Sequence, residues 1–310
     1  MSVIFRDFQL NASVIAPCIY ASAHHRTTTL GAVVSSSVQD ELRCLLRQLL
    51  DVAGVGSEGT FFRVDAYPDA SGLLNVLEVN AHFVDGWGTA LNLARAAGYR
   101  VALDPTCFPR LWTSEEDVYL PELQLTHDEL ARYGVQGGGQ PPRIIERREA
   151  LNGANEPVYW YGRFRRFDES PHIRPASGDR LDDKGLLSDL SLLWEGNEVL
   201  VPMTYGCEVA SWDELPRAVV FKPRRKYDTN SPVQFRSDIG RGREARQAYD
   251  EGETVAQEVL TRYLVANRPV QLVIMCAGTE PLTGYLQHAD EGTRIINDDS
   301  EHGPLIFADE

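Results

Sequence analysis

Four polar side chains occupy matching positions in residues 61–82, which read FFRVDAYPDASGLLNVLEVNAH. Two apolar runs flank a Pro-Asp-Ala-Ser-Gly turn, a pattern typical of a β-hairpin. Side chains alternate across a strand, so Arg63 and Asp65 share one face, as do Glu78 and Asn80. A turn centred on the Ser-Gly dipeptide places Asp65 opposite Glu78 and Arg63 opposite Asn80.

Two carboxylates that face each other across a hairpin destabilise it unless a cation lies between them. Asp65, Glu78 and the Asn80 amide are hard oxygen ligands, which suit Mg²⁺ held jointly with substrate phosphates. Arg63 is then placed to stabilise an anionic transition state. The hairpin alone leaves a second interpretation open, in which these residues simply face water on a half-exposed sheet.

Composition restricts the class of protein. The chain has 310 residues, enough for two or three domains or one large enzyme-like unit. Its net charge of −15 argues against general nucleic-acid binding. It contains no apolar run of about 18 residues, so we expect no membrane partner. Five cysteines without CxxC spacing are typical of a reduced, cytoplasmic protein, and the sequence leaves its oligomeric state open.

The elements that must position the hairpin alternate between helices and strands. Periodicity predicts helices at 38–53, 89–99, 183–194 and 242–252, with Ser36 or Ser37 as the first cap and Gly54 ending the first helix. Strands are predicted at 100–105, 156–164, 217–223, 254–260 and 270–278, with further strands in 284–289 and 293–298. The core face of the hairpin is expected to consist of Phe62, Val64, Leu77 and Val79. This mixture predicts an α+β or α/β fold.

A basic segment stands out in the acidic chain. Residues 217–246 contain nine Lys or Arg against three Asp or Glu. Such a segment is a candidate anion site, and a solvated surface loop explains the same composition.

The arrangement R-x-D followed by E-x-N, with thirteen positions from Asp65 to Glu78, resembles the metal-binding hairpin of ATP-grasp ligases, D-alanine–D-alanine ligases in particular. The resemblance implies that Asp65, Glu78 and Asn80 hold two Mg²⁺ ions on ATP. It also implies that Arg63 is catalytic and contacts the reacting phosphoryl group.

Three further segments resemble parts of the same family. AVVFKP is similar to the strand whose lysine holds the ATP phosphates, and ETVAQEVL is similar to the hinge that binds adenine. LDDKGLLSDL is similar to the segment that carries an earlier nucleotide-binding lysine. The implied ATP-binding residues are Lys184, Lys222, Gln257, Glu258, the backbone of Val259, and Leu260.

The order of these segments is unusual, because the metal hairpin precedes the lysine strand by about 140 positions instead of following it. The chain thus resembles circularly permuted ATP-grasp proteins, as in the glutathionylspermidine synthetase and eukaryotic glutathione synthetase groups. The resemblance implies a permuted ATP-grasp fold with a smaller substrate domain. Its expected parts are 1–95 with the metal hairpin, 96–180 as the substrate domain, and 181–310 for nucleotide binding. Permutation also predicts that the two ends of the chain lie close together.

The chain departs from the family pattern after Lys222, where PRRKYDTNSPVQFRS replaces a glycine-rich loop. Without glycines, backbone amides approach phosphates less closely. Arg224, Arg225 and Lys226 are candidate substitutes through side-chain charge. A loop that closes only with substrate and a degenerate site are the alternatives.

The function implied by the resemblance is an ADP-forming ligation. A carboxylate, such as an amino acid or a small acid, would be joined through an acyl phosphate to an amine or thiol. Two alternatives share the same motifs: an ATP-grasp kinase that phosphorylates a small molecule, and an inactive nucleotide-binding protein.

Overall fold

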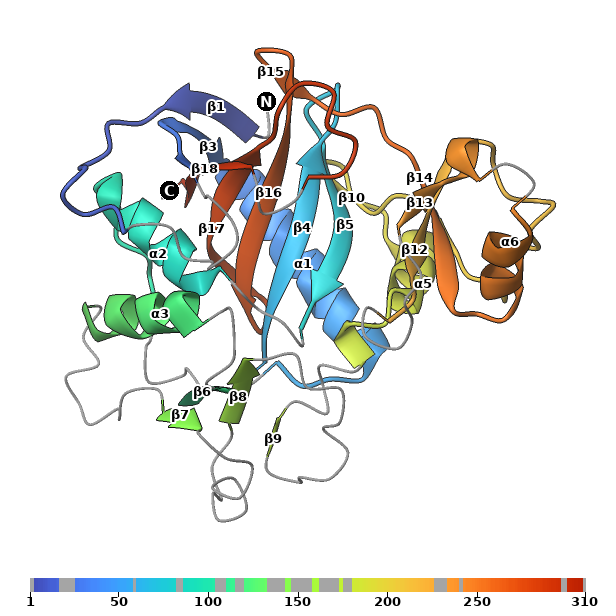
Figure 1. The fold of residues 1–310 in the computed structure, drawn as a ribbon, viewed down its shortest axis with the longest axis horizontal. Coiled ribbons are helices and arrows are strands. Elements are labelled where there is room, and N and C mark those ends of the chain that lie inside the picture. The colour runs from blue at the N-terminus through green and yellow to red at the C-terminus, as the bar shows by residue number, and fades with distance from the viewer. Residues whose placement is uncertain are drawn as a thin grey trace.

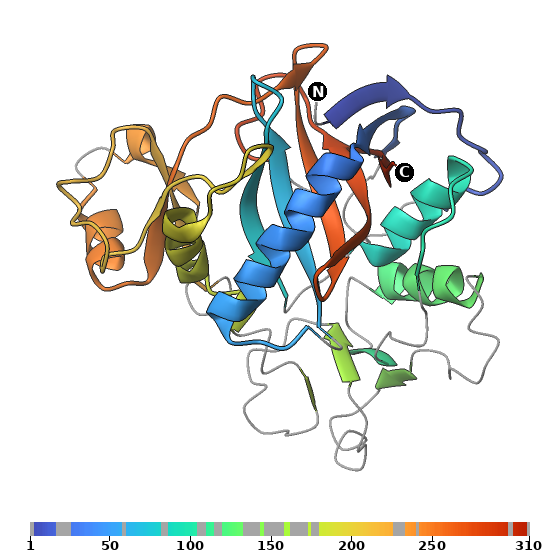
Figure 2. The same cartoon turned by 180° about the vertical axis from the view of Figure 1, so that it is seen from behind.

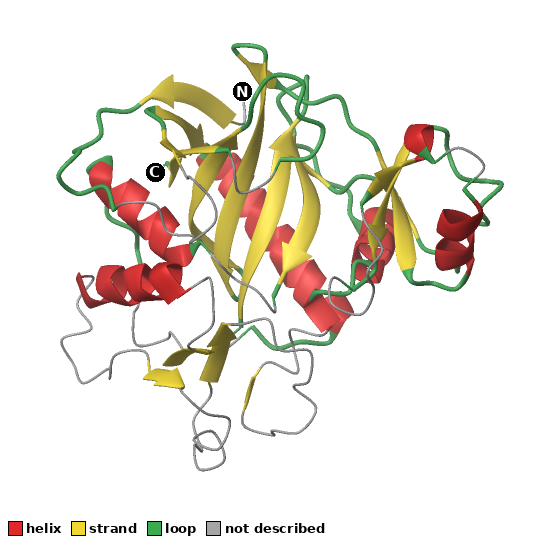
Figure 3. Cartoon of the chain, viewed as in Figure 1, coloured by secondary structure: helices red, strands yellow, loops and turns green. Residues whose placement is uncertain are grey.

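The computed structural model describes residues 3–16, 26–57, 60–81, 86–103, 110–114, 120–132, 143–145, 158–161, 173–174, 180–225, 233–239, 242–296 and 300–308. Within these ranges the protein has a mixed α+β fold, as the sequence predicts. A large sheet forms the centre, and a smaller sheet with its own helices lies beside it (Figures 1 and 3).

The large sheet has ten strands and contains the predicted hairpin. Its main path runs in the order β1 (Val3–Asp7), β3 (Leu30–Val34), β18 (Glu301–Phe307), β17 (Glu280–His288), β16 (Arg268–Ala277), β4 (Phe61–Pro68), β5 (Leu74–Asn80) and β10 (Val199–Leu200). β2 (Arg26–Thr27) pairs with β18, and β15 (Leu264–Val265) pairs with β16. The hairpin β4–β5 therefore pairs directly with β16, from the C-terminal part of the chain.

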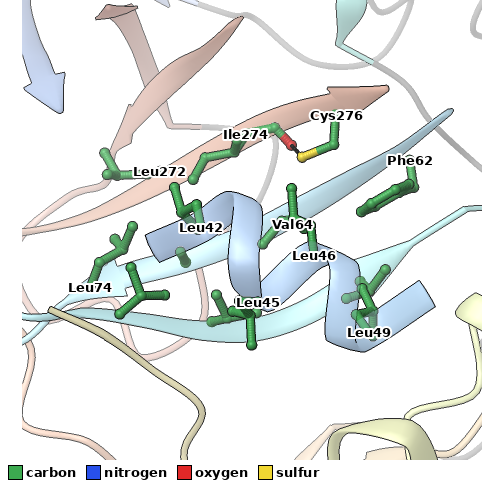
Figure 4. Close-up of a cluster of buried hydrophobic side chains, with 14 of the residues drawn as sticks. Leu42, Leu45, Leu46, Leu49, Phe62, Val64, Leu74, Leu272, Ile274 and Cys276 are labelled. Carbon is green, nitrogen blue, oxygen red and sulfur yellow. Dashed lines mark hydrogen bonds between the residues drawn. The ribbon is translucent and has the colours of Figure 1, made fainter. Parts of the chain in front are cut away.

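Helix α1 (Ser36–Ala53) covers one face of this sheet (Figure 2). Its leucines pack against strand residues such as Phe62, Val64 and Ile274, which burial stabilises (Figure 4). Gly54 ends the helix in the left-handed conformation, as predicted. The predicted caps Ser36 and Ser37 are wrong, because the helix starts earlier and the Ser35 hydroxyl accepts the Val38 N–H.

The opposite face is covered beside β17 and β18 by α2 (Trp87–Ala96), on which α3 (Leu120–Arg132) packs. Gly88 permits this close approach, since a Cβ there would lie 2.5 Å from the backbone nitrogen of Thr126. The buried Glu122 carboxylate accepts the Gly88 N–H at 2.9 Å. The helices thus cover the β17–β18 side of this face, and the β4–β5 hairpin lies farther across the sheet.

The small sheet is antiparallel and has four strands. Its order is β11 (Thr204–Tyr205), β14 (Thr254–Glu258), β12 (Val219–Pro223) and β13 (Gln234–Phe235), accompanied by α5 (Gly185–Leu193), the 3₁₀ turn η3 (Arg236–Asp238) and α6 (Arg243–Asp250). Trp212 stacks on Phe221 at 4.8 Å between ring centroids, next to the buried Tyr249. The small sheet therefore has a core of its own.

A third sheet of four parallel strands comes from the middle of the chain. Its order is β7 (Arg143–Ile145), β6 (Arg110–Ser114), β8 (Val158–Tyr161) and β9 (Ile173–Arg174). Most of the predicted substrate domain, 96–180, lies outside the described residues.

Two strand predictions are wrong. Residues 100–103 form no strand, and the remainder of 100–105 lies outside the described residues. Residues 293–296 form no strand and bend at Arg294 and Ile295, the remainder of 293–298 lies outside the described residues, and the strand of this region is β18, farther along the chain. β18 contains Gly303 and Pro304, residue types that weaken a strand signal.

The described ends of the chain are neighbours in the large sheet. β3 pairs in parallel with β18, with Ala32 opposite Leu305, and β1 is next to β3. The predicted closeness of the two ends is therefore confirmed, while the circular permutation stays a prediction. Among the described helices, none has both the length and the apolar content needed to cross a bilayer.

Candidate functional site

The hairpin has the predicted register. Asp65 pairs with Glu78, and Arg63 pairs with Asn80. The register shifts after Asp65, so that Ala66 pairs with Val76 and Leu77 bulges out of the ladder.

This bulge overturns one prediction about the core face. Phe62, Val64 and Val79 pack with α1 as expected. Leu77 instead joins a separate apolar cluster on the side of the candidate site. The other members of that cluster are Tyr67, Leu260, Ala289 and Ile296.

Side-chain cations hold both facing carboxylates. Arg63 Nε lies 3.0 Å from Asp65 Oδ1, and Asn80 Nδ2 donates to Asp65 Oδ2 at 3.3 Å. Lys184 Nζ lies 3.2 Å from Glu78 Oε1, and the Lys184 side chain is only 5 % exposed. The repulsion expected between the carboxylates is therefore offset within the protein.

Lys222 connects the small sheet to the hairpin. Its Nζ donates to Gln257 Oε1 at 2.8 Å and to the carbonyl of the bulged Leu77 at 3.2 Å. Gln257 Nε2 also donates to the Leu77 carbonyl, at 3.3 Å. Burial lowers the pKa of Lys222 to about 8, although the nearby Glu78 carboxylate opposes the shift.

The predicted hinge residues follow Gln257 along β14 and beyond. Glu258 accepts a hydrogen bond from the Tyr205 hydroxyl at 3.1 Å. The Val259 N–H donates to the Ala218 carbonyl at 2.9 Å, so this amide already has a partner inside the protein. Leu260 packs in the apolar cluster formed around Leu77.

One cavity of about 140 Å³ collects most of the predicted residues. Seven of the ten predicted metal, ATP-binding and catalytic residues line it: Asp65, Glu78, Lys222, Gln257, Glu258, Val259 and Leu260. Arg63, Asn80 and Lys184 contact its lining through the carboxylates. Residues that are far apart in the sequence thus meet at a single place between the two sheets.

A larger cavity of about 660 Å³ adjoins the first. The two share lining residues from β13 and the segment before β18, namely Val233, Phe235, Arg294 and Ile295. Pockets for small molecules usually measure about 300–1,000 Å³, so the larger cavity falls within this range and the smaller one below it.

Two arginines in the lining were not predicted. The Arg262 guanidinium lies 4.5 Å above the Tyr67 ring and donates to the Thr293 carbonyl at 3.2 Å. Arg294 stacks on Phe235 and bonds to Asp238 at 2.6 Å. The segment before β18 is thereby tied to the small sheet beside the cavity.

Neither arginine belongs to a recognisable sequence pattern. Tyr67 could have been found from the sequence, because it follows Asp65 by two positions on one strand.

The basic segment after Lys222 is partly used in ion pairs. Arg224 Nε lies 2.8 Å from Asp183 Oδ1 and Arg224 Nη1 lies 3.2 Å from Glu208, while Arg225 lies 3.6 Å from Asp183. Lys226 is outside the described residues. A phosphate-binding role for these three residues stays a prediction.

The donor set fits a metal held jointly with a substrate. In the described part of the chain, no group of three or more His, Cys, Asp or Glu could hold an ion by itself. Asp65, Glu78 and Asn80 lie together on paired strands and offer carboxylate and amide oxygens. Mg²⁺ is commonly bound through one or two carboxylates plus substrate phosphates, which is what these residues allow.

No protein-family model matches the chain, and no curated protein matches it. Among solved structures, it is similar to one described as "Putative gamma-glutamylcysteine synthetase" from Methylobacillus flagellatus KT. The two are 13 % identical, the alignment covers 87 % of each chain, and the TM-score is 0.45. At this level the similarity does not establish a function for the chain.

Proposed function

We propose that this protein is an ATP-dependent ligase that joins a small carboxylate to an amine or thiol through an acyl phosphate. The observation that carries the proposal is the shared cavity, in which the carboxylates of the hairpin meet Lys222 and the segment 257–260. The permuted ATP-grasp fold, its three parts and a cytoplasmic location belong to the same proposal.

Asp65, Glu78 and Asn80 would hold Mg²⁺, which when bound neutralises phosphate oxygens. Lys222 lines the same cavity from the small sheet, where its ammonium group donates to Gln257. An anionic phosphate beside Lys222 favours its charged form and so counteracts the effect of burial. The protein residues thus supply an anion site and a cation site side by side.

The base of the nucleotide would pack on the apolar cluster. Leu77, Leu260 and Ile296 line the cavity together with the ring of Tyr67. Burial raises the pKa of Tyr67 to about 12, so its ring remains a neutral phenol. A flat, uncharged base buries apolar area against this surface.

Arg63 would act during phosphoryl transfer. An oxygen of the substrate carboxylate attacks the γ-phosphorus, the bond to ADP breaks, and an acyl phosphate forms. The amine then attacks the acyl carbon, and inorganic phosphate leaves with the electron pair of the broken bond. Arg63 is held by Asp65 at 3.0 Å, and in this proposal its positive charge would stabilise the transferring group.

The test measures ADP and phosphate release with amino acids and small carboxylates, each supplied with and without an amine. We expect Mg²⁺-dependent ADP release accompanied by phosphate, and about 100-fold less turnover in Glu78→Gln. The exposed Asp51→Asn, at the end of α1, is the matched control and should retain wild-type turnover. ADP release without phosphate would identify a kinase, and absence of Mg²⁺-dependent nucleotide binding would disprove the proposal.

A further inference from the structure

Two buried glutamines lie on the same sheet face as the candidate site. Gln271 on β16 is 8 % exposed, and Gln287 on β17 is 4 % exposed. They are directly paired across the two strands, so their side chains project to one side. Val273, two positions after Gln271, pairs with Asp65, which places both glutamines on the Asp65 face.

The polar row continues into the next strand. Gln287 pairs with His302 on β18, and the His302 ring lies 4.9 Å from the Tyr285 ring. Neighbours on the other face, such as Leu272 and Leu286, are fully buried in the α1 core. A row of buried amides and rings therefore extends from the metal-ligand hairpin across the sheet.

The two amides have no partner within the described residues. Neither side chain makes a hydrogen bond to any residue that the structure describes. Their amide atoms are not among the fully buried unpaired polar atoms of the described residues, so they reach open space, where water or a ligand can satisfy them. Gln271 also lines the cavity that contains Asp65 and Glu78. The Gln271 amide thus belongs to the candidate site, and Gln287 lies beside it on the next strand.

We propose that Gln271 and Gln287 bind the substrate that is joined in the ligation, and that this substrate carries an uncharged amide group. The assignment rests on the proposed function for the identity of the reaction. A carboxamide offers two N–H donors and one carbonyl acceptor, which matches the donor and acceptor of a peptide bond. An apolar substrate would leave both amides unpaired, and an ionised group would lose hydration without gaining an opposite charge from either glutamine.

Strand spacing gives the size of the substrate. Adjacent strands lie about 4.8 Å apart, and residues lie about 3.3 Å apart along a strand. Gln271 is one strand and two residues from Asp65, and Gln287 is two strands and two residues away, which gives about 8 Å and 12 Å. An extended chain spans about 3.3–3.6 Å per residue, so a substrate whose carboxylate lies at Asp65 carries its amide about two to three residues from that carboxylate, as an N-acylated long-chain amino acid does.

The test uses two probes of equal chain length, 6-acetamidohexanoate and nonanoate, which differ in the amide at the far end of the chain. Calorimetric titration is done with and without a saturating non-hydrolysable Mg²⁺–ATP analogue. We expect wild type to bind 6-acetamidohexanoate about tenfold more tightly than nonanoate. Gln271→Leu and Gln287→Leu should remove this preference, while Gln247→Leu, on α6 and away from the site, should keep it.

Thermal melting separates recognition from structure. If the amides are unpaired in the free protein, both leucine variants should melt at or above the wild-type temperature. Equal affinity of wild type for the two probes, binding of neither probe while the ATP analogue binds, or a preference that survives both substitutions would overturn the assignment. A lower melting temperature in both leucine variants would also overturn it. Failure of the analogue to bind wild type would disprove the nucleotide function instead, and the probe titrations without analogue would then decide the amide subsite alone.

Discussion

Lys184 and Glu78 form an ion pair, with 3.2 Å between Nζ and Oε1, that joins the start of α5 to the hairpin of the large sheet. The Lys184 N–H also donates to the Arg224 carbonyl, which follows β12 of the small sheet. One buried lysine therefore connects three segments that are distant in the sequence. It also means that the Glu78 carboxylate has a cationic partner before any ligand binds.

This pair predicts a loss of stability for Glu78→Gln. The substitution keeps the shape of the side chain but removes the negative charge beside the buried Lys184. We expect the free energy of unfolding to fall by about 1–3 kcal/mol at pH 7, because a buried charge loses its partner. Urea denaturation of wild type and variant measures the difference.

A double variant provides the control. Glu78→Gln combined with Lys184→Met removes both charges, so stability should recover relative to Glu78→Gln alone. A single variant that equals or exceeds wild type in stability would mean that repulsion from Asp65 outweighs the ion pair.

The hairpin and its facing residues could be predicted from the sequence because they depend on local rules. Alternation determines the face of each side chain, and the turn determines which residues are opposite. The bulge at Leu77 could not be predicted, since an extra residue leaves no mark in the apolar pattern. It nevertheless supplies the carbonyl that Lys222 contacts.

Features that depend on pairing between distant strands were missed. The row of Gln271 and Gln287 exists only because β16 and β17 pair in one register, beside β4. Strand β18 was missed because it contains glycine and proline, yet it lies between β17 and β3. Sequence patterns carry no direct record of such contacts.

The close approach of Leu30 explains why β18 has a glycine at position 303, and this contact leads to a second prediction. A Cβ at this position would overlap the backbone carbonyl oxygen of Leu30, which cannot move aside like a side chain. We expect Gly303→Ala to lower the free energy of unfolding by about 2–4 kcal/mol, measured by urea denaturation. Gly56→Ala is the matched control, because a Cβ there meets nothing within 4 Å. Equal stability of the two variants would contradict the placement of β18.

The cysteines provide a third prediction. Cys276 is buried in the α1 core, and burial raises the pKa of its thiol, whereas Cys44 on α1 is exposed. Because the thiolate is the reactive form, a thiol reagent should modify Cys44 quickly and Cys276 only after unfolding. Peptide mapping by mass spectrometry measures both rates. Comparable labelling of the two residues in the folded protein would show that β16 is not in the core.

Lys222 predicts how the stability of the free protein varies with pH. Burial lowers its pKa to about 8 from the ordinary value of 10.5. The folded state therefore releases this proton at a lower pH than the unfolded state does, and the cost of a buried charge disappears as pH rises. This lysine's contribution to stability should increase between about pH 8 and 10.5. Urea denaturation of wild type and Lys222→Met across that range isolates it, and a pH-independent difference would contradict the shift.

The same lysine predicts that nucleotide binding takes up a proton. A phosphate beside Lys222 favours the charged form and returns its pKa toward 10.5. Binding of Mg²⁺–ADP near pH 9 should take up about one proton. The affinity for Mg²⁺–ADP should weaken as the pH rises above about 8. Calorimetry in buffers of different ionisation enthalpy measures the proton uptake.

Lys222→Arg is the control, since an arginine remains charged and the variant should bind Mg²⁺–ADP without proton uptake. Uptake that is unchanged in Lys222→Arg, or affinity that is unchanged in Lys222→Met, would remove Lys222 from the proposed phosphate site.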